Sequence, residues 1–454
     1  MVFLHDNPFS SSDLNSPSKP NYKRRRYWKI LSRISLVTAL LSACYFIGRS
    51  VHWDTLSQNY SFNKDVDLAR YLCNLPQVSD QSLEKDPSYL LLEHQRAEHL
   101  NQKESPQPDV TIPDSVWRDL PVKGAYYMVV RNEKLTEARS VIKSMEDHMK
   151  NGTRYPWVLL NNQPFTADFQ KYIRKVVTAP VFFGKIDLET WDYPYWIDVD
   201  RAEFMMMGQE LNNVHKGSSL SYHQLLRYHA GFFFHHPLLR DVEYTWRVEP
   251  GADYSCQMDQ DMFLLMKEQN KTLGFVITMH EMPESIPTLW KRVNEFVERF
   301  SNYILPEHET IYPWIYDEDA NDYNTCHFWT NFQLANLSFF RSEAYQQYFA
   351  YLDRTGNFFY ERWGDAPVQT IAAALFLKKE QIHFFNNIGY THSVATHCPY
   401  NQTLLQQCSC DVNINFDFHA ESCTKKLLKI IDPKAVSGMT KFLKAKDIQV
   451  PGQR

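Results

Sequence analysis

The chain has 454 residues, of which 15% are aromatic, and a formal net charge of −5 at pH 7. This length allows one large catalytic domain or two ordinary ones with a substantial core. The mildly acidic balance gives no reason to expect a nucleic-acid partner. Aromatic faces can stack on sugar rings, but an aromatic-rich core is the simpler explanation for their number.

A basic segment precedes the longest apolar stretch near the N-terminus. Residues 23–26 are all basic, and residues 27–48 are mostly apolar and long enough to cross a thin bilayer as a helix. We predict a cytoplasmic tail over 1–26, a transmembrane signal anchor over 27–48, and the rest of the chain on the lumenal side. A cleaved signal peptide and a lipoprotein cleavage site at Cys44 are the alternatives.

Cysteine usage favours an oxidising compartment. Of the eight cysteines, Cys44 lies in the apolar stretch, which leaves an odd number of seven, four of them between Cys398 and Cys423. We expect disulfides that staple a loop-rich tail, with one thiol free or paired to another molecule. A zinc site at Cys408 and Cys410, near two histidines, is the less favoured alternative.

The predicted membrane location is the Golgi apparatus or the endoplasmic reticulum. A short anchor suits the thinner membranes of the early secretory pathway. Sequences that accept N-linked glycans also agree with a lumenal domain. They begin at Asn59, Asn151, Asn270, Asn336 and Asn401.

Polar and proline-punctuated residues 49–122 indicate a stem, followed by a catalytic domain over 123–430 and a C-terminal tail over 431–454. The domain opens with alternating strand and helix patterns, which is typical of an α/β fold with ligands at the C-terminal ends of the strands. We therefore predict one α/β domain with a Rossmann-like mixed sheet. The predicted strands are 124–130, 157–160, 181–183, 244–248, 274–278 and 383–385, and the helices 135–149, 167–176, 222–231, 289–300 and 367–376.

Carboxylates follow the predicted strand 244–248. Glu249 ends it, and Asp259 and Asp261 come soon after. Acids at the end of a strand are suited to a divalent cation that holds a diphosphate. Asp259 and Asp261 form a short D-x-D pattern, which is more often a helix cap or a solvated turn.

Two later residues are further candidates. His392 follows the strand 383–385, and its imidazole suits transition metals, although a lone loop histidine is usually solvated. Asp365 precedes a helix, where an N-cap role is the simpler reading. Glu361 and Arg362 are either a solvated charge pair or, beside Trp363, a grip on a sugar hydroxyl.

Four separated motifs occur in a defined order: WRVEP at 246–250, CHFWTNF at 326–332, ERWGDAPVQTIA at 361–372 and HFFNNIGYTH at 383–392. Together they resemble the fungal α-1,2-mannosyltransferase family, glycosyltransferase family 15. The resemblance runs from about residue 124 to 423. The predicted anchor, stem and lumenal domain match the type II arrangement of that family.

The resemblance implies a GT-A-like fold and transfer of mannose, with retention, from GDP-mannose to mannose-terminated O- or N-linked glycans of glycoproteins. It also implies Mn²⁺ on the diphosphate, and complexes with other glycosyltransferases are expected partners. The implied roles are metal binding for Glu249 and His392, nucleotide binding for Glu249, Arg131 and Arg227, a place near the reacting carbon for Tyr222, and contact with the acceptor for Asp365.

The sequence departs from the family pattern at Gln333. The family has a glutamate proposed as nucleophile at this position, and an amide cannot act as an effective carboxylate nucleophile. Gln333 could instead support an oxocarbenium-like centre while the acceptor attacks the same face. The alternatives are a weak or inactive member that binds GDP-mannose or partner proteins, and a mannosylphosphate transferase.

Overall fold

The structure is a computed structural model that describes residues 111–150 and 152–446. The predicted cytoplasmic tail and anchor lie outside the described residues, as does most of the predicted stem. Cys73 and the acceptor asparagines Asn59 and Asn151 also lie outside them. Among the helices of the described ranges, none has both the length and the apolar character needed to cross a membrane.

A seven-stranded mixed sheet lies at the centre, in the order β12-β6-β11-β4-β1-β2-β3. The sheet strands are β1 Gly124–Val129, β2 Trp157–Asn161, β3 Val181–Lys185, β4 Tyr244–Val248, β6 Leu273–Phe275, β11 Phe332–Asn336 and β12 Ile382–Phe384. The first four run parallel, and β11 lies antiparallel between β4 and β6. The predicted α/β architecture with a mixed sheet is therefore confirmed.

Smaller sheets surround this one. They comprise β10 Cys326–Phe328 with β7 Thr278–His280, β13 Tyr390–His392 with β14 Ala395–His397 and β5 Asp253–Tyr254, and β8 Tyr316–Asp317 with β9 Asp322–Tyr323. The prediction of one strand over 274–278 is wrong. The chain divides there into β6 and β7, which belong to different sheets, because continuous apolar residues do not reveal where a strand changes partners.

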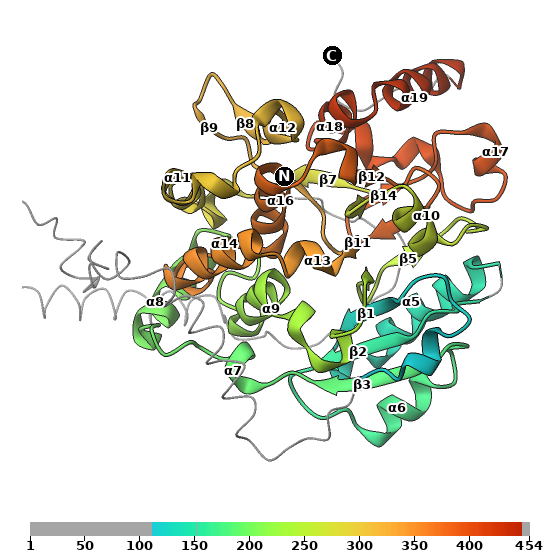
Figure 1. Ribbon diagram of the computed structural model, residues 1–454, viewed down its shortest axis with the longest axis horizontal. Helices are drawn as coiled ribbons and strands as arrows, with labels where there is room; N and C mark the ends of the chain where they lie inside the picture. Colours follow the sequence, from blue (N-terminus) through green and yellow to red (C-terminus); the bar gives the residue numbers. More distant parts are fainter. Residues whose placement is uncertain (1–110, 151, 447–454) are drawn as a thin grey trace, which may run out of the picture. The chain divides into compact units, whose positions relative to one another are not determined.

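Helices cover both faces of the central sheet (Figure 1). They are α5 Leu135–His148, α6 Ala167–Ile173, α7 Leu188–Trp191, α8 Val199–Leu211, α9 Leu220–Gly231, α10 Met262–Glu268, α11 Leu289–Arg299, α12 Tyr312–Ile315, α13 Leu337–Phe340, α14 Glu343–Arg354, α15 Asn357–Tyr360, α16 Asp365–Phe376, α17 Gln402–Leu405, α18 Thr424–Ile431 and α19 Pro433–Ala445. Each predicted helix is present, with ends shifted by a few residues.

The alternation of side chains along β1 divides the core into two clusters. Tyr126 belongs to one cluster and Tyr127 to the other, and Leu159 and Val158 of β2 are divided in the same way. Successive residues of a strand point to opposite faces, so a strand buried on both faces must be apolar throughout. This explains why β2 is a continuous run, WVLL, followed by a buried Asn161.

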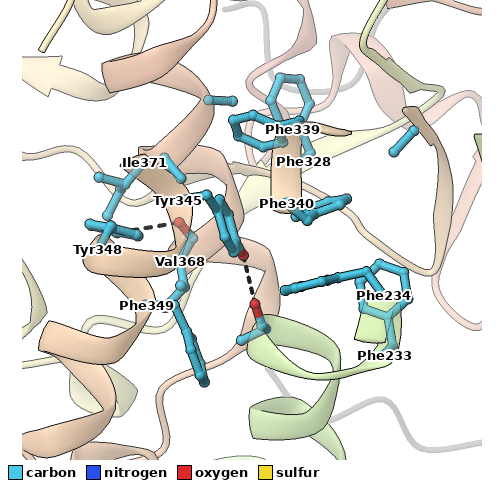
Figure 2. Packing of buried hydrophobic residues seen from close by; sticks show 14 of the residues in the cluster. Phe233, Phe234, Phe328, Phe339, Phe340, Tyr345, Tyr348, Phe349, Val368 and Ile371 are labelled. Carbon is cyan, nitrogen blue, oxygen red and sulfur yellow. Dashed lines mark hydrogen bonds between the residues drawn. The ribbon is translucent and has the colours of Figure 1, made fainter. Parts of the chain in front are cut away.

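Aromatic side chains fill the larger cluster, as Figure 2 shows between α9, α14 and α16. Phe234 stacks on Phe340 with ring centroids 5.4 Å apart. The Tyr345 hydroxyl donates a hydrogen bond to the Ala230 carbonyl at the end of α9 (2.7 Å). The high aromatic content therefore serves mainly to build the core, and buried tyrosine hydroxyls satisfy helix termini.

Packing extends past both predicted ends of the catalytic domain. Trp117 is buried and donates from its indole nitrogen to the Gly124 carbonyl (2.9 Å). At the other end, α19 buries Met439 and Leu443 beside Leu428 of α18. The predicted limits of 123 and 430 are too narrow, because isolated apolar residues in a polar segment give little sequence signal until their partners are known.

Three disulfides join Cys256 to Cys408, Cys326 to Cys423 and Cys398 to Cys410. These bridges confirm the prediction of disulfides and include all six cysteines of the described residues. Two bridges connect the tail to earlier parts of the domain instead of closing loops within the tail. The alternative zinc site is wrong, because Cys408 and Cys410 belong to different bridges.

Candidate active site

Arg247 occupies the centre of a buried group of charges near the C-terminal end of β4. Its Nη1 lies 2.6 Å from Asp365 Oδ2 of α16, and its Nη2 lies 3.2 Å from Glu249 Oε2. The side chains of Arg247 and Asp365 are 9% and 3% exposed, whereas that of Glu249 is 24% exposed. Glu249 is therefore the carboxylate of this group that solvent or a ligand can reach.

This group holds its charges in place. Burial alone would lower the pKa of Arg247, but Asp365 and Glu249 raise it above its ordinary value. Asp365 also accepts a hydrogen bond from the Thr330 hydroxyl (2.7 Å). An ion pair with this many partners fixes the carboxylate groups in one geometry.

Asp365 is not the N-cap that its position before a helix suggested. Gly364 is the N-cap residue, and Asp365 is the first residue inside α16. Its carboxylate turns towards Arg247 because a buried guanidinium is a stronger partner than the amides of the helix start. The sequence could not show this, since Arg247 lies more than a hundred residues earlier in the chain.

Gln333 of β11 lies directly opposite Arg247 of β4 in the antiparallel register. It is 5% exposed, and its Nε2 donates to Oε1 of Gln369 (2.7 Å). Gln369 belongs to α16, four residues after Asp365, so β11 and α16 lie side by side at this point (Figure 1). Residues four apart share a helix face, and this face contacts both members of the Arg247–Gln333 pair.

His392, at the end of β13, is held between Asn331 and Trp329. Its Nδ1 lies 3.0 Å from Nδ2 of Asn331, and its ring meets the Trp329 ring edge-on at 5.4 Å. Burial lowers the pKa of His392, although the Glu249 charge and a hydrogen bond to the Pro250 carbonyl act in the other direction. The imidazole is therefore neutral near pH 7 and can offer a lone pair.

The surroundings of His392 fit a metal ligand. Asn331 Oδ1 is buried without a hydrogen-bond partner among the described residues. A half-turn of this amide would let Oδ1 accept from Nδ1–H of the ring and would leave Nε2 as the ligand atom. An imidazole nitrogen whose pKa responds to the Glu249 charge forms, with that carboxylate, a suitable donor pair for a divalent transition metal such as Mn²⁺.

A second buried ion pair lies beside this group. Glu281 Oε1 is 2.7 Å from Nη2 of Arg362. Burial alone would raise the pKa of Glu281, but the charges of Arg362 and His327 lower it below its ordinary value. Burial raises the pKa of Tyr222 to about 12, although Arg362 acts the other way, so the phenol keeps its proton at neutral pH and can donate a hydrogen bond.

The prediction that Glu361 and Arg362 form a solvated charge pair is wrong. Arg362 pairs with Glu281 and is buried, whereas Glu361 accepts from the Thr288 hydroxyl (2.6 Å) and from the Trp363 indole nitrogen (2.6 Å). Glu361 and Arg362 are therefore not a solvated pair. Adjacent residues in an extended segment point to opposite sides.

The D-x-D acids lie in a structural turn, as the favoured reading predicted. Asp261 is the N-cap of α10 and accepts from the amides of Phe263 and Leu264, both at 3.1 Å. Asp259 is half-exposed and lies 3.7 Å from Nζ of Lys150.

The two arginines predicted to contact the nucleotide have different surroundings. Arg227 is buried and makes a two-pronged ion pair with Asp353, with N–O distances of 2.7 Å at both contacts. Its charge is therefore already balanced inside the protein. Arg131 is exposed, just after β1. The structure brings neither of them into contact with Arg247, and their role at the nucleotide stays a prediction.

Comparison with known proteins decides the family. The family profile described as "Glycolipid 2-alpha-mannosyltransferase" matches residues 79–432. The chain belongs to this family. It is thus a glycosyltransferase of the mannosyltransferase class, and the resemblance drawn from the four motifs is confirmed.

Two curated relatives in this family come from Candida albicans. Glycolipid 2-alpha-mannosyltransferase 2 is 43% identical over 307 residues, which is 67% of this chain and 66% of the relative. Glycolipid 2-alpha-mannosyltransferase 1 is 39% identical over 341 residues, which is 75% of this chain and 79% of the relative. The alignment with the first of them thus spans about two thirds of its length.

Solved structures show the same family fold. Core-mannan synthase A from Aspergillus fumigatus, in its Mn/GDP form, is 34% identical with a TM-score of 0.65, over 69% of this chain and 86% of that one. The mannosyltransferase Ktr4p from S. cerevisiae, in complex with GDP, is 32% identical with a TM-score of 0.66, over 78% and 94%. The mixed α/β glycosyltransferase fold is thereby established.

Three residues of the candidate site lie in or beside the four sequence motifs but are not among the sequence-based candidates. They are Arg247, Asn331 and Gln369. Arg247 is two residues before Glu249 on a strand, and Gln369 is four residues after Asp365 on a helix. Both spacings place a residue on the same face as the candidate already identified. For Arg247 and Gln369, the signal was present in the strand and helix periodicities.

Proposed function

We propose that this protein is a retaining α-1,2-mannosyltransferase that transfers mannose from GDP-mannose to mannose-terminated O- or N-linked glycans of glycoproteins. The observation that carries the proposal is the contact of Glu249, Arg247 and Asp365 at the end of β4, with the neutral His392 ring nearby. Similar proteins are named α-1,2-mannosyltransferases, including O-glycoside enzymes. The fold would then be of the GT-A type.

Glu249 and His392 would hold Mn²⁺ on the diphosphate of the donor. The cation, when bound, supplies positive charge where the departing GDP develops negative charge. Arg247 orients Glu249, because its guanidinium contacts that carboxylate. Of the two predicted arginines, Arg131 is exposed and available to the nucleotide, whereas Arg227 would act indirectly, through its contacts with Asp353 and the Thr190 carbonyl.

Gln333 determines how retention can be achieved. Since an amide is a poor nucleophile, the acceptor hydroxyl would attack the anomeric carbon on the face from which GDP leaves. The new bond joins that carbon to the acceptor oxygen, the bond to the diphosphate breaks, and the hydroxyl proton passes to the diphosphate. Tyr222 is the residue we assign to the reacting carbon, and Asp365, which is buried and paired with Arg247, would act on the acceptor side through the groups that it holds in place.

We propose the membrane arrangement on sequence grounds. Residues 1–26 would form a cytoplasmic tail, 27–48 a signal anchor and 49–122 a stem, whose last residues pack onto the domain at Trp117. The location would be the Golgi apparatus or endoplasmic reticulum, with complexes between glycosyltransferases. Asn270 and Asn401 are exposed acceptor sites, so N-glycosidase treatment of the native protein should increase its mobility on a gel if the domain is lumenal.

The test of activity uses the purified full-length chain with GDP-mannose, Mn²⁺ and α-methyl mannoside. We expect a dimannoside with an α-1,2 linkage by mass spectrometry and NMR, and loss of product when Mn²⁺ is chelated. Because of Gln333, the second candidate function is a protein that binds GDP-mannose without turnover. GDP binding without mannose transfer would support this binding function and refute the mannosyltransferase activity. A product that carries mannose phosphate would instead identify a mannosylphosphate transferase.

A further inference from the structure

Two buried glutamines connect β11 to the end of α9. Nε2 of Gln333 donates to Oε1 of Gln369, and Nε2 of Gln369 donates to the backbone carbonyl of His229 (2.8 Å). Both glutamines are nearly inaccessible, at 5% and 2% exposed. His229 lies in the last turn of α9, where backbone carbonyls lack partners within the helix.

The direction of this chain of hydrogen bonds is fixed by the carbonyl at its end. A carbonyl oxygen can only accept, so Gln369 must turn its NH₂ group towards His229 and its oxygen towards Gln333. Gln333 must then donate in turn, which leaves its own carbonyl oxygen directed away from Gln369. An amide rotated by half a turn at either position would bring two acceptors together, so the usual ambiguity of amide orientation is absent here.

The same chain disfavours an ionised carboxylate at position 333. A carboxylate has no proton to donate, and it would face the oxygen of Gln369. Rotation of Gln369 would not help, because its oxygen would then face the His229 carbonyl. The surroundings of Gln333 therefore suit a neutral donor, although Arg247 lies opposite on the neighbouring strand.

We infer that Gln369 is a positioning residue that fixes the Gln333 amide, with its carbonyl oxygen free to face the reacting sugar. The predicted effect of Gln369 on catalysis rests on the proposed function, whereas the hydrogen-bond chain itself does not. The active site of this chain is built around a neutral side chain at position 333. Gln333→Glu alone should consequently not create an efficient nucleophile, because the introduced carboxyl group keeps its proton to satisfy Gln369.

The kinetic test compares Gln369→Met with Gln209→Met. Gln209 is also buried, and its amide donates to a backbone carbonyl, that of Tyr360 (3.2 Å), away from Gln333. For Gln369→Met we expect kcat to fall about tenfold or more while KM for GDP-mannose changes less than about twofold, since orientation and not donor binding is lost. Gln209→Met should keep kcat per folded molecule. An unchanged kcat in Gln369→Met would overturn the inference.

A second test does not depend on mannose transfer. Melting temperatures of Gln333→Glu and of Gln333→Glu/Gln369→Met are measured from pH 4 to 8, each relative to its parent with Gln333. A proton held for Gln369 raises the folded pKa of the introduced carboxyl group, so stability falls as pH rises through that value. The fall begins near the ordinary pKa of glutamate in both variants, and without Gln369 it should end about one pH unit lower.

The two tests separate the possible failures. If the wild-type chain transfers no mannose, the proposed function fails, and the melting curves alone decide whether Gln369 sets the polarity of position 333. Coincident pH midpoints in the single and double variants would overturn the inference. A large gain in kcat in Gln333→Glu would overturn it as well, because the carboxylate would then be accommodated.

Discussion

At the scale of single residues, Arg247 connects two carboxylates that have different surroundings. Asp365 is buried with Thr330 as a second donor, and Glu249 is partly open to solvent. A buried ion pair adds little net stability compared with apolar residues, but loss of one partner leaves an unpaired charge in the protein interior. Arg247 therefore matters for folding as well as for the site.

Replacement of Arg247 by Met should lower the free energy of unfolding by about 3–5 kcal/mol, because Asp365 would be left buried without a cation. Urea denaturation followed by circular dichroism measures this loss. The control is Lys143→Met, which removes a solvent-exposed i,i+4 pair with Asp147 on α5 and should change stability little. Equal effects of the two substitutions would show that the Arg247 pair is not the stabilising element described here.

Asn331 orients His392, because its side-chain amide contacts Nδ1 of the imidazole. Asn331→Leu should weaken activation by Mn²⁺ by about 10–100-fold, because the imidazole loses the partner that fixes its ring. Titration of activity or of GDP binding against Mn²⁺ gives the half-maximal concentration. A shift in kcat without a shift in this concentration would contradict the assignment of His392 to the metal.

At the scale of elements, α9 and α16 are helices that face the site with one side and the core with the other. Every residue of α16 from Pro367 to Leu375 is buried, which agrees with a helix that is apolar on nearly all sides. α9 approaches α14 closely at Gly231, where an added Cβ would lie 1.9 Å from the Phe349 ring. This close approach sets the end of α9 and thereby the position of the His229 carbonyl.

Gly231→Ala should destabilise the protein by about 1–3 kcal/mol, because either Phe349 or the end of α9 must move. Thermal unfolding measures the loss. Gly208→Ala on α8, where an added Cβ meets nothing within 4 Å, is the matched control and should be neutral or stabilising. Similar losses at both positions would show that helix–helix approach is not the cause.

Element types were predictable to a large extent and their partners were not. The periodicities over 135–149 and 244–248 predicted α5 and β4 within one residue at each end. The segment 274–278 was predicted as one strand although it supplies two sheets, because strand pairing depends on residues that follow much later, in β10, β11 and β12. The antiparallel β11, which carries Gln333, was not predicted as a strand, and the motif CHFWTNF ends at its first residue.

At the scale of the whole molecule, long-range links hold the C-terminal segment onto earlier parts of the domain. The Cys326–Cys423 bridge closes a separation of 97 residues, and Cys256–Cys408 one of 152. A partly accessible histidine adds a dependence of stability on pH. Burial lowers the pKa of His383 in β12 to about 4, and its ring packs 4.5 Å from that of Phe385.

Stability should therefore decrease as pH falls from about 6.5 towards 4. The unfolded chain binds a proton at His383 with an ordinary pKa, and the folded chain resists it, so acid favours unfolding over this window. His383→Gln should reduce the loss over this range by about 2 kcal/mol, because the partly accessible ring contributes less than a fully buried one. Urea unfolding curves at a series of pH values measure this. Parallel curves for both proteins would contradict it.

The sequence by itself determined the α/β class, the order of the main elements, the family and the acids and histidine at the strand ends. Those features depend on local periodicity and on short ordered motifs. Only the tertiary structure decided that Asp365 pairs with Arg247 and that Gln333 donates to Gln369. The physical reason is that a buried polar group takes whichever partner satisfies it best, and these partners come from β4, β11 and α16, which meet only in the folded protein.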